Sequence, residues 1–578
     1  MSFRGFLNAK NRISKEDKEF NELKNKAAEY YRANGVPQRL EDVLSEMFMV
    51  KPRDIYGYLA NYFSRLAHTP TISAVVGREV YDSRGEVALQ VDVYCIIRNE
   101  EKLVCSAVVN SGNEDVMDSG NAVANGNHRQ ASVAVALEWI REHLSPMLHG
   151  VNPGLQTHLD KLLSDFYMAR YLEDQDARNQ EIQIKEEGRT ESVPEDVPPS
   201  VQAQSKDKKG GEKGKKESAP EKPLPPPELP APVLPGAVAV AAVSLAVAKT
   251  AAALTAAPLY KHIITLRDPQ ALSSVLMPTA LVTVFSCGKT SAGKLNLLEE
   301  VILLPTVART TRQIVQMGLD LQREVRRIAS TAAGKSGPAV AGVSDTGALQ
   351  LGFDRPEQAL DLLMEACTNL DLPIGTDLRL LLNLAAHTLM DYPKGKYEVM
   401  SGTLKSPDEL VDMLVGLVNK YPAIVGLIDP LRKEDVDQWQ TLSSLLGQTC
   451  VLIADASHSP HQQWQEARPP PPSVTWVTLG QRSEMTLTDL LHAVRERTDV
   501  ETILALSSED MGDVSMVDVA VGLGVSYIKL GGLDGCERMN KYNRLQNIER
   551  ELQEQGILAR TREVKLPCVI KPEELTEH

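Results

Sequence analysis

The side chains that could take part in chemistry stand at the ends of short apolar runs. Lys529 closes the run VSYIK and precedes two glycines, and Asp455 closes the run CVLIAD. An ammonium at such a strand end can hold a carboxylate or a phosphate as a point charge. It can also act as a catalytic lysine, or form a salt bridge with Asp455 or Glu300 that avoids an unpaired buried charge. The residues alone leave these three roles open.

The elements that would position these residues are repeated strand–helix units in residues 266–578. Six apolar runs predict strands: LRLLLNLAA, AIVGLID, CVLIAD, VTWVTL, TILALS and VSYIKL. Amphipathic helices are predicted between them at 407–420, 436–446, 485–496 and 513–523. Units of this kind form a parallel sheet, and this many form a barrel. Because barrel chemistry lies at the C-terminal strand ends, the residues to consider are Asn383, Ile428, Asp455, Thr478, Leu506 and Lys529.

A smaller α+β domain is predicted at 69–265. The segments ALQVDVYCIIR and KLVCSAVV read as paired strands around the polar turn RNEE, and residues 130–148 read as a helix. The Ala-rich stretch 236–260 is interrupted by Lys249, so we expect a buried helix and no membrane span.

Composition is that of a globular chain of the cell interior. The 578 residues are 43% apolar and 24% charged, so two or three domains are expected. A net charge of −15 argues against general nucleic-acid binding, because no basic surface is available to neutralise phosphates. Seven scattered cysteines and an N-terminus without an apolar signal predict a cytoplasmic location. Residues 186–235 are charged and proline-rich, and we expect a disordered insertion there.

Residues 1–68 are predicted to form a helical extension. A first amphipathic stripe consists of Leu40, Val43, Leu44, Met47 and Phe48, and a second of Ile55, Tyr58, Leu59, Tyr62, Phe63 and Leu66. Pro52 suits the first turn of the second helix. The hairpin at 40–66 resembles a dimerisation-docking motif, which implies a docking role. The alternative is a helical extension packed on the main body of the chain.

Four quoted segments resemble the enolase family. They are REVYDSRGEVALQVDVY (78–94), VSLAVAKTAAALTAAPLYKHI (243–263), LEEVILLPTVA (298–308) and YIKLGGLDGCERMNKYNRL (527–545). The resemblance implies an α+β N-terminal domain followed by an enolase-type α/β (TIM-like) barrel, usually dimeric. It also implies the reversible dehydration of 2-phosphoglycerate to phosphoenolpyruvate with Mg²⁺.

The resemblance places the family's three acidic metal ligands at Asn383, Ile428 and Asp455. Only Asp455 is a carboxylate, and Ile428 has no ligand atom. Because Mg²⁺ prefers charged oxygen ligands, we expect its binding to be weak. Asp429 follows Ile428, and we expect its side chain on the opposite face of the strand, where it could substitute only after a register shift of one residue.

The family's catalytic base falls at Thr478. Thr478 has no useful pKa near neutrality, and no lysine occurs in residues 434–528 that could replace the base. Glu300, Ser508 and Lys529 fall at positions that contact substrate in the family.

Two functional hypotheses follow from these substitutions. One is an active phosphopyruvate hydratase that supports glycolysis. The other, which the loss of base and metal charge favours, is a structural or scaffold protein built on a degenerate enolase body. The N-terminal hairpin, the insertion and the altered site resemble a divergent sperm-associated branch of the family, which implies a motility-linked role in the sperm flagellum with a scaffold partner bound through residues 40–66.

Overall fold

The structure of the protein, a computed structural model, describes residues 15–110, 122–190, 233–306, 309–332, 340–456, 474–497, 500–506 and 511–559. The chain divides into two compact units. One consists of Met1–Pro70 with Ile96–Glu100, and the other of Thr71–Cys95 with Glu101–His578. Most of the predicted disordered insertion, 191–232, lies outside the described residues. Its first part, 186–190, is instead the helical end of α6 (Gln156–Thr190), so the prediction is wrong there.

Eight strands of the second unit form a closed barrel, as the sequence predicts. They are β4 (Thr279–Ser286), β5 (Glu300–Pro305), β8 (Leu378–Asn383), β12 (Ile424–Ile428), β13 (Val451–Asp455), β14 (Trp476–Gly480), β15 (Glu501–Ala505) and β16 (Tyr527–Lys529). Pairing of β16 with β4 closes the ring. Neighbouring strands are parallel except at β5, which is antiparallel to both β4 and β8. Two short strands, β6 (Val340–Val343) and β7 (Leu349–Leu351), extend the sheet beyond β4.

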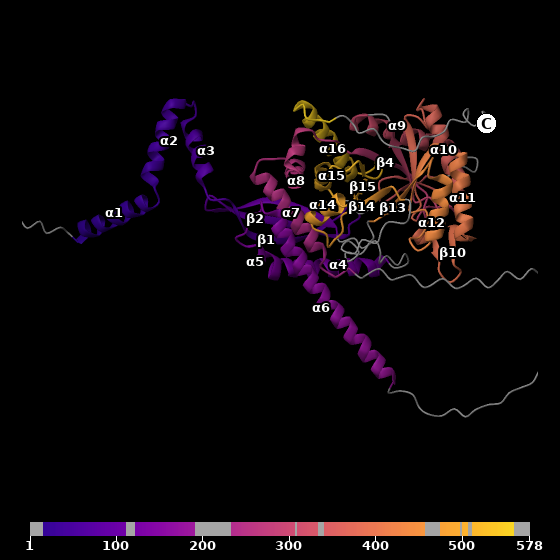
Figure 1. Cartoon of the computed structure of the whole chain (residues 1–578), viewed down its shortest axis with the longest axis horizontal. Coiled ribbons are helices and arrows are strands. Elements are labelled where there is room, and N and C mark those ends of the chain that lie inside the picture. Colours follow the sequence, from indigo (N-terminus) through magenta and orange to yellow (C-terminus); the bar gives the residue numbers. More distant parts are fainter. Residues whose placement is uncertain are drawn as a thin grey trace, which may run out of the picture. The chain divides into compact units, whose positions relative to one another are not determined.

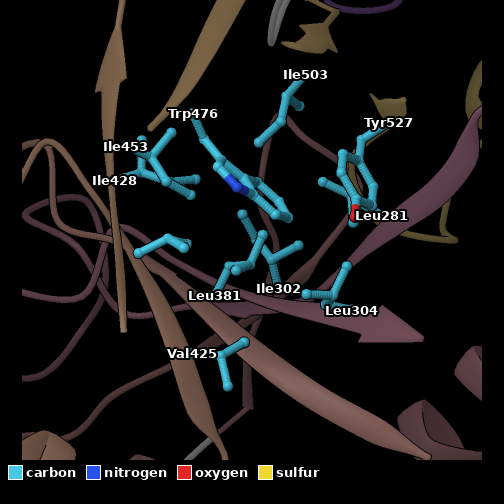
Figure 2. Packing of buried hydrophobic residues seen from close by; sticks show 11 residues of the cluster. Leu281, Ile302, Leu304, Leu381, Val425, Ile428, Ile453, Trp476, Ile503 and Tyr527 are labelled. Atoms are coloured by element: carbon cyan, nitrogen blue, oxygen red, sulfur yellow. The ribbon is translucent and has the colours of Figure 1, made fainter. Parts of the chain in front are cut away.

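The barrel interior is filled by large apolar side chains from all eight strands. The cluster consists of Leu281, Ile302, Leu304, Leu381, Val425, Ile428, Val451, Ile453, Trp476, Ile503 and Tyr527. Figure 2 shows Ile428 beside Ile453 in this packing, and the rings of Trp476 and Tyr527 stack with centroids 4.7 Å apart. The interior is therefore a packed core, and polar groups are left to the ends of the strands.

Helices follow the barrel strands and cover their outer faces (Figure 1). They are α9 (Thr311–Ala332), α10 (Pro356–Asn369), α11 (Pro407–Lys420), α12 (Val436–Leu446), α14 (Leu487–Arg495), α15 (Ser515–Leu523) and α16 (Cys536–Glu554). The predicted helices 407–420 and 436–446 are confirmed at both ends. The start of α11 is fixed by a capping box, because Ser406 and Glu409 each accept a hydrogen bond from the other's backbone N–H.

Short elements complete the barrel domain. They are the 3₁₀ turns Pro269–Ser273 and Ala386–Leu389 and the strands β9 (Met390–Asp391), β10 (Lys396–Met400) and β11 (Thr403–Lys405). The last three form a small separate sheet in the order β11–β10–β9.

A three-stranded sheet and a group of helices precede the barrel. The sheet consists of β1 (Thr71–Tyr81), β2 (Val87–Ile97) and β3 (Glu100–Asn110). The helices are α4 (Ala122–Trp139), a π-helical turn (Ile140–Leu144), α5 (Ser145–Leu148), α6, α7 (Val238–Leu254) and α8 (Leu259–Arg267). The Ala-rich helix α7 is buried along nearly its whole length, as predicted. Within the described residues no single helix is long and apolar enough to cross a membrane, and α7 with α8, bent by 103°, passes that test only as a pair.

A buried carboxylate ties α6 and α7 to the barrel helix α14. Asp160 accepts hydrogen bonds from Gln156 Nε2, Ser244 Oγ, Thr488 N and Thr488 Oγ1, all between 2.6 and 2.9 Å. Burial nevertheless raises the pKa of this carboxyl. Three helices distant in sequence therefore share one polar junction, because each supplies a donor that the buried oxygen atoms need.

Among its described residues, the other unit contains three helices, α1 (Lys15–Ala33), α2 (Val36–Val50) and α3 (Ile55–Leu66). The two predicted amphipathic helices are thus present as α2 and α3. Pro52 does not lie in the first turn of α3 as predicted. Instead Asp54 caps that helix by accepting a hydrogen bond from Gly57 N at 2.8 Å, because a carboxylate satisfies an N–H that the helix start leaves free.

Close packing of α15 against α8 gives a prediction for Gly522. A Cβ at this position would lie 2.5 Å from Ile263 Cβ, so we expect Gly522→Ala to lower the free energy of unfolding by about 1–3 kcal/mol. Gly416 of α11 is the matched control, because nothing lies within 4 Å of its added Cβ. Gly416→Ala should stabilise by about 0.5–1 kcal/mol through helix propensity. Urea denaturation of both variants measures the difference, and equal effects would contradict the packing described here.

Candidate functional site

A cavity of about 710 Å³ opens at the barrel end where the parallel strands terminate. Four of the predicted site residues line it: Glu300, Asn383, Asp455 and Lys529. Side chains of the preceding domain, on β3 and α7, also contribute to its wall. The strand-end rule applied to the sequence therefore predicted that Asn383, Asp455 and Lys529 lie at the same end of the barrel, where they line this cavity.

Glu300 reaches this end of the barrel because β5 runs against its neighbours. An antiparallel strand presents its first residue where parallel strands present their last. Accordingly, Glu300, the first residue of β5, is directly paired with Asn383, the last residue of β8.

A buried ion pair joins the two charged ends. Lys529 Nζ donates a hydrogen bond to Glu300 Oε2 at 2.5 Å, and Asn383 Nδ2 donates to the same oxygen at 2.8 Å. Thr283 Oγ1 lies 3.3 Å from Glu300 Oε1 and donates to it. The side chain of Glu300 is 5% exposed and that of Lys529 is 14% exposed. Of the three roles left open for Lys529, the salt bridge to Glu300 is thus confirmed.

The electrostatics of Glu300 follow from these contacts. Burial raises the pKa of its carboxyl, whereas the charge of Lys529 and the hydrogen bond from Lys529 lower it. The hydrogen bonds from Asn383 and Thr283 add to the lowering, and the net pKa lies below the ordinary value. Glu300 is therefore an anion at neutral pH, and the amide at 383 is engaged as a donor to it.

The structure corrects the prediction for Asp429. Ile428 faces the packed barrel interior, so it offers the cavity no polar atom. Strand β12 ends at Ile428, and Asp429 leaves it with a positive φ of 45°. The alternation of strand faces stops there, and the Asp429 carboxylate turns into the cavity wall, where Oδ1 accepts a hydrogen bond from Asp455 N at 2.8 Å. The following Pro430 is the sequence signal that was missed, because proline cannot continue the strand.

Thr478 lies on the interior face of β14, two residues beyond Trp476 of the core cluster, and is paired with Asp455 of β13. Its side chain is buried, with 1% exposed, and Oγ1 has no hydrogen-bond partner among the described residues. Thr478 is not among the residues that line the cavity, whereas its register partner Asp455 is.

Two predicted strand ends differ slightly from the observed ones. Strand β14 continues two residues beyond Thr478 to Gly480, and Leu506 lies one residue beyond β15, where it lines the cavity. Ser508 lies outside the described residues, so its predicted contact with substrate stays a prediction.

Sequence reasoning missed further charged groups of the cavity wall. Arg482 Nη2 lies 2.7 Å from Glu484 Oε1, and both side chains line the cavity beside the end of β14. Lys541 of α16 lines it as well and donates a hydrogen bond from Nζ to Met511 O at 3.0 Å. Lys541 carries no sequence signal, because it lies within a charged helix far from any strand end.

The barrel has one antiparallel strand, β5, and the carboxylate of its first residue, Glu300, pairs with Lys529 at the end of the last strand, β16. This arrangement defines an enolase-type barrel. A family model described as the enolase C-terminal TIM barrel domain matches residues 274–566. The chain belongs to the enolase family.

Relatives of high similarity are proteins named Enolase 4. The one from Danio rerio is 56% identical over 556 residues, which cover 95% of each chain. The one from Homo sapiens is 40% identical over 565 residues, covering 94% of this chain and 90% of the relative. A protein named Enolase from Bdellovibrio bacteriovorus is 30% identical over 285 residues, or 49% of this chain and 65% of the relative.

The enolase family usually uses Mg²⁺, and the donor set of this cavity does not fit that ion. Oε2 of Glu300 is held by Lys529, and the Asn383 amide turns an N–H toward the same oxygen. Asp429 Oδ1 is occupied by the Asp455 backbone N–H. Across the part of the chain that the structure describes, no group of three or more His, Cys, Asp or Glu side chains is arranged to hold a metal ion.

The buried pair gives a stability prediction. Lys529→Met should lower the free energy of unfolding by about 3–5 kcal/mol at pH 7, because it leaves the Glu300 charge buried without its cation. The loss should shrink as the pH falls, since protonation of Glu300 then removes the uncompensated charge. Urea denaturation as a function of pH measures both effects.

The matched control is the double variant Lys529→Met with Glu300→Gln, which removes both charges and keeps the side-chain shape. It should be more stable than Lys529→Met alone at pH 7, with a much weaker pH dependence below neutrality. A double variant that is no more stable than the single one would argue against charge compensation as the purpose of the pair.

Proposed function

We propose that this chain descends from an enolase-family lyase but that its barrel no longer dehydrates 2-phosphoglycerate at a useful rate. In this proposal the chain serves as a structural protein. The observation that carries this proposal is the buried Thr478 hydroxyl at the position of the family's base. Abstraction of a proton beside a carboxylate requires a group whose pKa can be matched to the reaction. A threonine hydroxyl has no useful pKa near neutrality and cannot accept that proton.

The fate of the remaining charged groups supports the same proposal. A 2-phosphoglycerate molecule brings its own negative charges and needs cations to hold them. Lys529 is already neutralised by Glu300, and the carboxylates of Asp429 and Asp455 line the same cavity. Binding of substrate would therefore place anion against anion at the point where the dehydration must be stabilised.

An active phosphopyruvate hydratase supporting glycolysis in the flagellum is the alternative. Glu300, Ser508 and Lys529 would then contact substrate, and Asn383 and Asp455 would take part in Mg²⁺ binding, as the family resemblance implies. Asp429 favours this alternative to some extent, because its carboxylate reaches the cavity where Ile428 supplies no ligand atom.

The test is the formation of phosphoenolpyruvate from 2-phosphoglycerate by the purified full-length chain with saturating Mg²⁺. We expect no turnover above that of the double variant Lys529→Ala with Glu300→Gln, which serves as the control for contaminating host enzyme. Because the base and most of the metal charge are absent, activity should lie several orders of magnitude below that of an active enolase, on the scale set by loss of a catalytic group.

Activity that is present in the wild-type chain and absent from the double variant would overturn the proposal and establish the alternative. The melting temperature with and without Mg²⁺ gives a second reading, because an ion that binds the folded state raises it in proportion to occupancy. A large Mg²⁺-dependent rise would show that Asp429 and Asp455 assemble a working metal site.

We further propose that α2 and α3 dock the chain to a scaffold protein of the sperm flagellum. Val43 is the one residue that is buried in these two helices, whereas nine large apolar side chains are exposed: Leu40, Leu44, Phe48, Met49, Val50, Ile55, Tyr56, Phe63 and Leu66. At on the order of 100 Å² each, they offer roughly 900 Å² per chain, which matches one side of a standard protein interface. An amphipathic helix of the scaffold protein is the occupant that such a two-helix surface fits.

Leu59→Asp or Phe63→Asp should release the protein from demembranated sperm flagella, because each places a charge in the apolar surface of α3. Asn61→Asp is the matched control, since it adds the same charge at an exposed position of the same helix. The retained fraction is measured by quantitative immunoblotting, and circular dichroism verifies that the barrel remains folded. Equal retention of all three variants would exclude docking through this hairpin, and loss of self-association without loss of retention would assign the surface to a second copy.

A further inference from the structure

The ion pair of Arg482 and Glu484, beside the end of β14, uses only half of its charged atoms. Arg482 Nη2 lies 2.7 Å from Glu484 Oε1. Arg482 Nη1 and Glu484 Oε2 are buried and have no hydrogen-bond partner among the described residues. The side chain of Glu484 is 2% exposed and that of Arg482 is 11% exposed, and both line the barrel cavity. Because a buried polar atom without a partner costs free energy, these two atoms point to a ligand that satisfies both.

Two other buried arginine–carboxylate pairs of the barrel domain are bidentate. Arg544 donates from Nε and Nη2 to the two carboxylate oxygens of Asp518, at 2.8 and 2.6 Å. Arg432 donates from the same two nitrogens to the two oxygens of Asp435, at 3.1 and 2.6 Å. Bidentate pairing gives both oxygen atoms of a carboxylate a donor. The pair in the cavity wall instead keeps one donor and one acceptor for a further partner.

We propose that Arg482 and Glu484 bind the head group of a free α-amino acid that enters the barrel cavity. The ligand carboxylate accepts a hydrogen bond from Arg482 Nη1, and the ligand ammonium donates one to Glu484 Oε2. Both charged groups of an α-amino acid are attached to the same carbon atom, so one small ligand reaches both members of a contacting ion pair. Each contact is a charge-assisted hydrogen bond. This site is independent of turnover of 2-phosphoglycerate.

The rest of the cavity wall determines which amino acid side chains fit. Among the described residues that line the cavity, Asp and Glu number seven, whereas Lys and Arg number four. The wall is therefore acidic overall and disfavours a ligand with an anionic side chain. Val233, Leu245 and Met516 line the same cavity and offer apolar surface. The ligands are thus α-amino acids with an apolar or a cationic side chain, for which leucine and lysine serve as probes.

The test is isothermal titration calorimetry of the wild-type full-length chain at pH 7, and we expect free leucine and free lysine to bind. N-acetylleucine lacks the ammonium, and leucine methyl ester lacks the carboxylate. Each should bind more than about tenfold more weakly than leucine, because each loses one charge-assisted hydrogen bond. Glutamate should bind more than about tenfold more weakly than lysine, because its side chain meets the acidic wall.

A double variant assigns the binding to this pair. Arg482→Met with Glu484→Gln removes both charges together and should weaken leucine binding by more than about tenfold. The matched control is Arg544→Met with Asp518→Asn, which removes a buried pair outside the described cavity wall and should leave the affinity for leucine unchanged. Thermal denaturation verifies that both variants are folded. If the first one fails to fold, the five ligands measured on the wild-type chain still decide the question.

Three results would overturn the proposal. The first is no binding of leucine or lysine up to about 10 mM, which would leave the two buried atoms to ordered water. The second is binding of N-acetylleucine or the methyl ester as tight as that of leucine, or of glutamate as tight as that of lysine. The third is an unchanged affinity for leucine in the folded Arg482→Met, Glu484→Gln variant.

Discussion

The ion pair between Glu300 and Lys529 is the constraint on which the cavity end of the barrel depends. The carboxylate is buried and could not remain ionised without its cation, and the lysine is nearly as well covered. The pair also joins the antiparallel strand β5 to the last strand β16, on opposite sides of β4. The pair thereby helps to fix the geometry of the barrel mouth.

Much of the barrel could be predicted from the sequence, because its strands and helices follow regular patterns of apolar residues. Six predicted strands lie in the barrel, and the apolar runs that predicted them end within three residues of the observed ends. The helices 407–420 and 436–446 were found from their amphipathic patterns, and in 407–420 the capping residue Ser406 and Pro407 agree with that pattern. Asn383, Asp455 and Lys529 were placed at one end of the barrel by the strand-end rule, whereas Glu300 was singled out through the family resemblance and reaches that end because β5 is antiparallel.

The features that escaped prediction depend on conformation beyond a single element. Asp429 was assigned to the wrong face because the alternation rule was extended one residue past the end of β12, into a backbone with positive φ. Lys541 enters the cavity from a helix whose pattern resembles that of any charged surface helix. The polar junction at Asp160 brings together three helices separated by up to 328 residues, a relation that no local pattern can reveal. Tertiary packing decides each of these cases.

The closure of the barrel through β16 and β4 also bears on the order of events during synthesis. Lys529 follows its partner Glu300 by 229 residues. At about 5–20 residues per second, a ribosome needs on the order of 10–45 seconds to supply that lysine after the glutamate has been made. Until then Glu300, in the hairpin of β4 and β5, has no cation beside it. Its carboxyl group must either stay in water or be buried in the protonated form. The barrel of the nascent chain must therefore stay open. It closes, by pairing of β16 with β4, only after the whole barrel sequence has been synthesised.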